Sequence, residues 1–67
     1  MQFVLKEDYI ELIRLLKVMS LVASGGEAKM VVDDGLVKVN DEVERRKRAK
    51  LRKGDVVSFE HQTIELI

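Results

Sequence analysis

The sequence predicts an α+β fold in which two short helices pack on a small, mainly antiparallel β-sheet. Three patterns support this class: apolar residues at helical spacing after Asp8, a helix-capping sequence at Ser24, and alternating apolar residues after Gly35. The 67 residues allow one domain, spanning residues 1–67. Its core is small, because a chain of this length buries only about 60% of the surface that it exposes when unfolded.

The N-terminal part of the chain predicts an edge strand followed by an amphipathic helix. Residues 3–5 form a short apolar segment, and Asp8 can cap the helix by accepting a backbone N–H. The following residues repeat at helical spacing over about three turns. Apolar and charged sets lie on opposite sides: Ile10, Ile13 and Leu16 against Glu11, Arg14 and Lys17.

A second, shorter helix is predicted over residues 25–34. Ser24 stands three residues before Glu27, which is the spacing of a capping box. In such a box the serine hydroxyl accepts one free backbone N–H and the glutamate carboxylate reaches back for another. Gly35 can then adopt the left-handed conformation that ends a helix.

After the second helix the apolar pattern changes to alternation, which predicts the strands of the sheet. Asn40-Asp41 is expected to turn a hairpin whose register stays open. A two-residue loop pairs Val39 with Glu42, whereas one more loop residue brings Val43 opposite Val39. The remaining expected elements are a turn at Gly54-Asp55 and strands at residues 56–59 and 62–67.

The basic segment, residues 45–53, holds seven of the twelve Lys and Arg residues of a chain whose formal net charge is zero. Like charges at this density repel one another, so contact with a polyanion explains the segment better than solubility alone does. If residues 46–52 are extended, alternation places four cations on one face and two apolar residues toward the core. These two sets are Arg46, Arg48, Lys50 and Arg52 against Ala49 and Leu51.

The aromatic residues and two methionines are expected to serve packing. Tyr9, Phe3 and Phe59 are too scattered along the chain to form a paired aromatic platform for nucleic-acid bases, so we expect them in the core or at its rim. Met19 and Met30 are expected to fill gaps in the helix packing.

Several function classes lack the residues that they require. The absence of cysteine excludes disulfides and thiolate metal sites, and no apolar run approaches the roughly 20 residues that span a bilayer. His61 is the only histidine and has no partner at catalytic spacing, and the chain contains neither a nucleophile with its base nor a nucleotide-binding loop. We therefore expect a cytoplasmic, monomeric, non-enzymatic protein without cofactor, metal, membrane contact or small-molecule substrate.

Three stretches resemble the S4 (S-four) RNA-binding domain, named after ribosomal small-subunit protein four: residues 24–29 (SGGEAK), 35–41 (GLVKVND) and 53–57 (KGDVV). The likeness is greatest to small stand-alone bacterial members of the YbcJ-like and YaaA-like type, and it covers roughly residues 10–59. It implies a helix pair on a small sheet, the αL motif, that binds structured RNA. Two positions depart from the family pattern: Gly25 stands where many members have Arg, and Asp41 stands where the turn glycine is usual.

The resemblance also implies RNA contacts at the start of the second helix, at the hairpin and along the basic segment. The implied residues are Ser24, Gly25, Gly26, Lys29, Lys38, Asn40, Arg45, Arg46, Lys47, Arg48, Lys50, Arg52 and Lys53. Whether Gly25-Gly26 binds a phosphate through free N–H groups or only forms a turn stays open. The implied target is structured rRNA or a ribosomal subunit, in ribosome assembly or in ribosome-associated quality control.

An alternative function fits the same basic segment. The segment could dock on an acidic surface of a partner protein, with RNA binding incidental, or it could serve solubility without any ligand. Association with RNA that disappears on ribonuclease treatment would favour the RNA-binding function. Association that ribonuclease leaves intact would favour the protein-interaction function.

Overall fold

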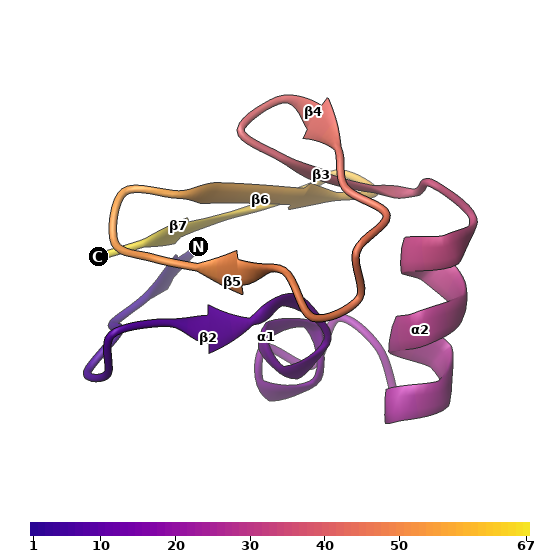
Figure 1. Ribbon diagram of the computed structural model, residues 1–67, viewed down its shortest axis with the longest axis horizontal. Helices are drawn as coiled ribbons and strands as arrows, with labels where there is room; N and C mark the ends of the chain where they lie inside the picture. The colour runs from indigo at the N-terminus through magenta and orange to yellow at the C-terminus, as the bar shows by residue number, and fades with distance from the viewer.

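The computed structural model describes all residues, 1–67, and confirms the predicted α+β class (Figure 1). The helices are α1 (Leu12–Val18) and α2 (Gly25–Asp33). The strands are β1 (Gln2–Phe3), β2 (Ile10–Glu11), β3 (Val37–Val39), β4 (Glu42–Val43), β5 (Lys50–Leu51), β6 (Val56–Phe59) and β7 (Gln62–Leu66). Both helices lie on one side of the sheet and pack against each other (Figure 1). No helix is long and apolar enough to cross a bilayer.

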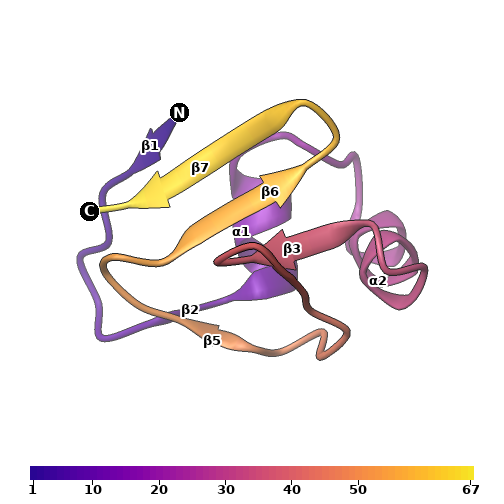
Figure 2. The same ribbon diagram turned by 90° about the horizontal axis from the view of Figure 1, so that it is seen from above.

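Five strands form one sheet in the order β1-β7-β6-β3-β4, and Figure 2 shows β1, β7, β6 and β3 from above. β1 runs parallel to β7, and all other neighbours are antiparallel. Both chain ends lie at the β1–β7 edge, where the N-terminal amine donates a hydrogen bond of 2.8 Å to the Thr63 carbonyl (Figure 2). β2 and β5 form a separate antiparallel pair, in which Ile10 lies opposite Leu51. The sheet is therefore mainly antiparallel, as predicted.

The two ends of α2 confirm the predicted signals. Ser24 Oγ accepts the Glu27 N–H at 3.1 Å. The Glu27 carboxylate accepts the N–H of Ala23, one residue before the group that a capping box usually uses. Gly35 follows the helix with a φ of +74°. Local sequence is thus sufficient to set where α2 begins and ends.

The predicted start of α1 is wrong. Asp8 does not cap this helix, which begins at Leu12 with Glu11 as an N-cap that makes no side-chain hydrogen bond. The two residues before the helix pair with β5 as β2. The first two helical N–H groups donate to the carbonyls of Ala49 and Lys47, at 3.0 and 3.2 Å. A segment distant in sequence therefore replaces the expected side-chain cap.

The β3–β4 hairpin has the two-residue loop. Val39 pairs with Glu42, so only Asn40 and Asp41 turn the chain, with φ of 52° and 70°. Positive φ at both central residues is the geometry that suits the twist of a tight hairpin. The Asn40 side chain ties this turn to residues 55 and 56. Its amide nitrogen donates to the Asp55 carboxylate at 3.0 Å, and its amide oxygen accepts the Val56 N–H at 2.9 Å.

The core lies between the sheet and the helices, and all of its buried side chains are apolar. Its largest fully buried members are Leu12, Leu15, Leu16, Val32, Val37, Leu51, Val57, Ile64 and Leu66. The buried side of α1 is thus formed by its leucines, while Ile13 of the predicted apolar series is only half-buried. Met19 is half-buried against the core, but Met30 is 55% exposed and does not fill a gap between the helices.

Candidate nucleic-acid interface

The basic segment lies against one end of each helix. Its carbonyls at Lys47 and Ala49 accept the first N–H groups of α1. Two of its side chains reach Asp33, in the last turn of α2: Arg45 Nη1 donates to the Asp33 carbonyl at 2.8 Å, and Lys47 Nζ lies 3.1 Å from the Asp33 carboxylate. The segment therefore ties the beginning of α1 to the end of α2.

The backbone of the basic segment is not one extended strand, so the predicted alternation over residues 46–52 is wrong in part. A turn at Lys47-Arg48 interrupts it, and only Lys50–Leu51 pair as β5. The Ala49 N–H closes this turn on the Arg46 carbonyl at 3.2 Å, while the carbonyls of Lys47 and Ala49 bond to α1. Ala49 and Leu51 are buried, with 6% and 2% exposure, which confirms them as the apolar anchors.

The first half of the basic segment, residues 45–47, is fastened by its own charges. Arg46 donates to the Glu44 carboxylate from its backbone N–H, Nε and Nη2, at 3.0, 3.0 and 3.1 Å. These side-chain hydrogen bonds lower the pKa of Glu44, against the opposing effect of burial, and they raise the pKa of Arg46. Together with the contacts of Arg45 and Lys47 to α2, they leave no cation of this half without a protein partner.

The second half, residues 48–53, has no side chain paired with a carboxylate. Arg48 and Lys53 make no side-chain hydrogen bond or ion pair. Lys50 Nζ and the guanidinium carbon of Arg52 lie 4.9 and 5.8 Å from the centroid of the Tyr9 ring. Arg52 Nη1 also approaches the carbonyl of Asp8, the residue before Tyr9, at 3.4 Å. The charges of this half are therefore available to an anion.

One side of α2 extends the charged surface toward α1. Gly25, Lys29 and Asp33 are four residues apart and form a stripe along the helix. At the start of the stripe, a Cβ added to Gly25 would lie 3.8 Å from Lys17 Cδ, so the Lys17 stem crosses the beginning of α2. At its end, Asp33 meets Lys47. Lys29 thus lies between two lysines that come from α1 and from the basic segment.

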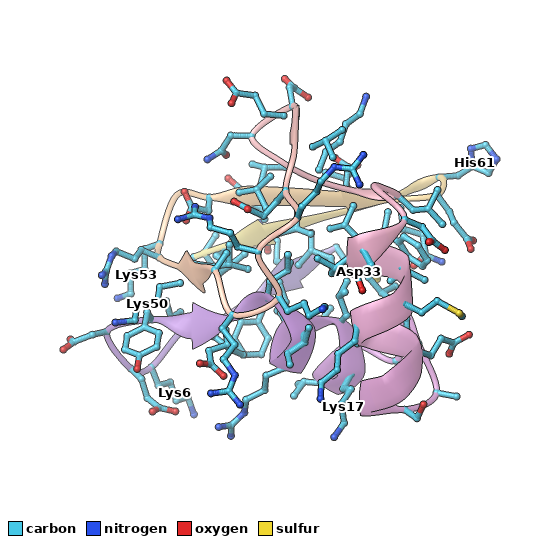
Figure 3. All side chains as sticks on the ribbon, turned by 45° about the vertical axis from the view of Figure 1, so that its right-hand side comes forward. Lys6, Lys17, Asp33, Lys50, Lys53 and His61 are labelled. Atoms are coloured by element: carbon cyan, nitrogen blue, oxygen red, sulfur yellow. The ribbon has the colours of Figure 1, made fainter.

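Cations from these three elements form what we call the helix-side cationic surface. Its members are Arg14, Lys17, Lys29, Lys47, Arg48, Lys50 and Arg52. In Figure 3, Lys17 projects below the two helices, Lys50 and Lys53 lie close together at the left of the view, and His61 projects at the upper right, away from all three. Sequence reasoning missed Arg14 and Lys17. Their i, i+3 spacing marks an exposed side of a helix, but only the fold brings Lys17 to the beginning of α2 and Arg14 to the hollow beside Tyr9.

The remaining residues predicted to contact RNA lie on another face or already make hydrogen bonds within the protein. Lys38 is exposed on β3 between two inward-facing valines, so it lies on the sheet face opposite the helices. Both polar atoms of the Asn40 amide are engaged within the protein. The Ser24 hydroxyl is used by the helix cap, and the Glu27 carboxylate lies at the helix start beside Gly25-Gly26. No three His, Cys, Asp or Glu side chains cluster in a way that could hold a metal ion.

Known proteins share this arrangement. The S4 domain family matches residues 3–67. The YbcJ protein of Escherichia coli (strain K12), named a putative RNA-binding protein, is 39% identical over 62 residues, which are 92% of this chain and 89% of YbcJ. The solution structure of YbcJ, described as revealing an αL motif involved in RNA binding, has a TM-score of 0.75 and covers 98% of this chain and 85% of its own.

Two further proteins extend the comparison. RlbA of Bacillus subtilis (strain 168), named a probable ribosome maturation protein, is 42% identical over 53 residues, which are 79% of this chain and 75% of RlbA. The ribosomal protein S4e of Thermoplasma acidophilum shares the fold, with a TM-score of 0.70 at 24% identity, over 87% of this chain and 31% of S4e. The chain therefore belongs to the S4 domain family and carries the αL motif.

Proposed function

We propose that this protein is a non-catalytic RNA-binding protein that holds structured RNA against its helix-side cationic surface. The observation that carries the proposal is the position of the basic segment, which brings cations from α1, α2 and β5 together although the chain has no net charge. Asp33 is the one carboxylate in the α2 stripe, and Lys47 already neutralises it. A polyanion would therefore meet an excess of positive charge.

The binding energy would come mainly from contacts with phosphates. Each phosphate that a Lys or Arg neutralises releases condensed counterions, and the affinity then falls as salt rises. Selectivity would depend on RNA shape, because side chains cannot enter the deep, narrow major groove of a regular RNA helix. The helix pair and the basic segment present several cations from different elements on adjoining parts of the surface, which suits a folded RNA.

Ribosomal RNA is the proposed target, in ribosome assembly or in ribosome-associated quality control. YbcJ, whose structure is described as revealing a motif involved in RNA binding, supports RNA as the ligand, and RlbA, named a probable ribosome maturation protein, supports the ribosomal target. The proposed location is the cytoplasm, where ribosomes assemble.

The test is the salt dependence of binding to an rRNA fragment by a triple variant, Lys17→Ala, Lys29→Ala and Arg48→Ala. These residues come from the three elements that build the surface, and none is needed for the core. We expect the slope of log affinity against log salt to become shallower by about 0.7–0.9 for each phosphate that the variant no longer neutralises. Thermal unfolding of the variant should stay close to that of the wild type.

Lys38→Ala provides the matched control for Lys29→Ala. Both changes remove one exposed lysine and the same charge, but Lys38 lies on the other face of the sheet. The proposal requires a larger loss of affinity from Lys29→Ala. Equal losses of affinity from the two changes, or an unchanged slope in the triple variant, would contradict it.

Co-sedimentation with ribosomal particles separates RNA binding from docking on an acidic protein. Association that persists at moderate salt and disappears after ribonuclease treatment agrees with the proposal. Association that ribonuclease leaves intact would instead support the protein-interaction alternative.

A further inference from the structure

We infer that Tyr9, at the border of the helix-side cationic surface, is a stacking platform for one unpaired RNA base. By binding that base, Tyr9 would distinguish bulged RNA from fully paired RNA. This inference rests on the proposed function. It starts from the exposure of the ring: Tyr9 is 39% exposed, although an aromatic side chain of a small domain is usually needed in the core. The core here is complete without it.

The β2–β5 pair fixes the surroundings of the ring. Ile10 lies opposite Leu51, and both side chains point into the core. Alternation then puts Tyr9 and Arg52 opposite each other on the outer face, with Lys50 as the diagonal neighbour. The distances of 4.9 and 5.8 Å from these cations to the ring centroid agree with that register. The aromatic ring and the two cations therefore form one preorganised cluster.

Tyr9 also borders an open hollow whose lining carries three carboxylates and one arginine. The hollow is lined by Glu7, Asp8, Tyr9, Ile10, Glu11 and Arg14. Its three carboxylates outnumber Arg14 and would repel a phosphate, and the cations at the ring would repel a positively charged ligand. A flat, neutral group with N–H donors on its edge avoids both repulsions. An unpaired nucleobase has these properties, while its own phosphate could reach Lys50 or Arg52.

The carboxylates also predict which bases fit. Adenine, cytosine and guanine carry an exocyclic amino group that can donate to a carboxylate, whereas uracil carries none. The geometry therefore favours a single-nucleotide bulge with an amino-bearing base. The cationic surface would hold the flanking helix through its phosphates, and Tyr9 would select the irregular position.

The test compares two RNA hairpins that differ only in one bulged adenosine. We expect wild-type protein to bind the bulged hairpin more tightly, and Tyr9→Leu to reduce that preference by about 5-fold or more, since base stacking on an aromatic ring commonly contributes at least this much. Tyr9→Phe keeps the ring and should keep the preference. An equal preference in wild type and Tyr9→Leu would overturn the inference, even though both hairpins are bound.

Fluorescence gives a readout that a purely structural role of Tyr9 would not change. Tyr9 is the only tyrosine and the chain has no tryptophan, so the emission reports this ring alone. A third hairpin carries the same bulge without its base. Strong quenching by the bulged hairpin, with much weaker quenching by the paired and the abasic hairpins at equal saturation, supports stacking. Equal quenching by all three hairpins contradicts it. Failure of every hairpin to bind would overturn the proposed function together with this inference.

The base preference has its own test. Replacing the bulged adenosine with uridine should weaken binding to the wild type, and the double change Glu7→Gln and Asp8→Asn should narrow the difference between the two bases. Comparing the ratio of affinities, rather than either affinity, removes the general gain expected from deleting two negative charges. If the double change does not alter the ratio of the affinities for the adenosine and uridine hairpins, the carboxylates do not contact the base.

Discussion

The two halves of the basic segment have similar composition but different surroundings. In residues 45–47 every cation contacts a protein acceptor: Arg45 the end of α2, Arg46 the Glu44 carboxylate, and Lys47 the Asp33 carboxylate. In residues 48–53 no side chain is paired with a carboxylate, and two cations lie over an aromatic ring instead. A run of positive charge can thus include residues that hold the segment in place and residues whose charges stay without a carboxylate partner.

This difference explains how seven like charges can be kept within nine residues of a folded domain. The first half reduces its own repulsion by using nearby acids and a helix carbonyl, which carries partial negative charge at the end of α2. The second half is held by its apolar residues, so its cations need no partners. Each of the following changes tests one part of that division, beginning with the largest expected effect.

Leu51→Ala should weaken the anchoring of the second half most. Leu51 is 2% exposed and lies opposite Ile10 in the β2–β5 pair. Removing a buried leucine side chain leaves a cavity and costs about 2–5 kcal/mol of unfolding free energy. Urea unfolding measures the loss, with Leu36→Ala as the control because Leu36 is 55% exposed. Similar losses of stability from both changes would show that Leu51 is not an anchor.

Gly35→Ala should loosen the first half. An alanine there would hold an unfavourable φ of +74°, and its Cβ would lie 2.8 Å from Arg45 Nη2. The left-handed conformation alone costs a residue with a Cβ about 1–2 kcal/mol. Moving the arginine tip away would disturb the hydrogen bond that Arg45 Nη1 donates to the Asp33 carbonyl. Unfolding free energies of Gly35→Ala, Arg45→Ala and the double variant would show less than additive losses if the two residues act together.

Arg45→Ala and Arg48→Ala provide the sharpest comparison of the halves. Both remove one arginine from the same segment and change the net charge equally. Arg45→Ala should cost about 0.5–1.5 kcal/mol of stability, because it deletes a hydrogen bond to the Asp33 carbonyl. Arg48→Ala should leave stability nearly unchanged and cause the larger loss of RNA affinity. Thermal unfolding measures the stability of each variant, and RNA titration at one salt concentration measures its affinity. A larger loss of stability from Arg48→Ala together with a larger loss of affinity from Arg45→Ala would refute the division.

The smallest effect concerns the pH dependence of the Glu44–Arg46 pair. Because folding lowers the pKa of Glu44 below its ordinary value of 4.5, the pair adds stability above that pH, and this contribution is lost as pH falls through the folded pKa. Arg46 is 80% exposed, so solvent keeps the contribution small. Between about pH 6 and pH 3, Glu44→Gln should lose less stability than Glu42→Gln, an exposed control on β4. If the two variants lose the same unfolding free energy between these pH values, the Glu44–Arg46 pair does not contribute to stability.

The elements that sequence reasoning could predict are those controlled by adjacent residues. The cap at Ser24 and the stop at Gly35 depend on side chains or backbone conformations within a few residues. The turn at Asn40-Asp41 is also visible in the sequence through two residues that tolerate positive φ, although the bonds of Asn40 to Asp55 and Val56 are not. The start of α1 is different, since its first N–H groups bond to the carbonyls of Ala49 and Lys47, which are distant in sequence. No helix-capping rule could identify that partner.

The candidate site divides in the same way. The basic segment is visible in the sequence, and so are its buried anchors Ala49 and Leu51. The contribution of Lys17 depends on the packing of α1 against α2, and the exposed position of Tyr9 depends on the β2–β5 register. The sequence predicts Tyr9 only in the core or at its rim, because spacing along the chain does not show that two cations lie beside its ring. Long-range pairing supplies that information.

Amide chemical-shift mapping of the isotopically labelled protein during titration with a structured rRNA fragment tests most directly whether RNA binds the helix side of the molecule. The largest changes should occur in α1, from Gly25 to Lys29 and from Arg48 to Lys53. Lys38 and Val43, on the outer face of the sheet, should change little, as should His61 at the far end (Figure 3). Largest changes at Lys38 and Val43, with α1 and Lys29 unaffected, would contradict the proposed binding surface.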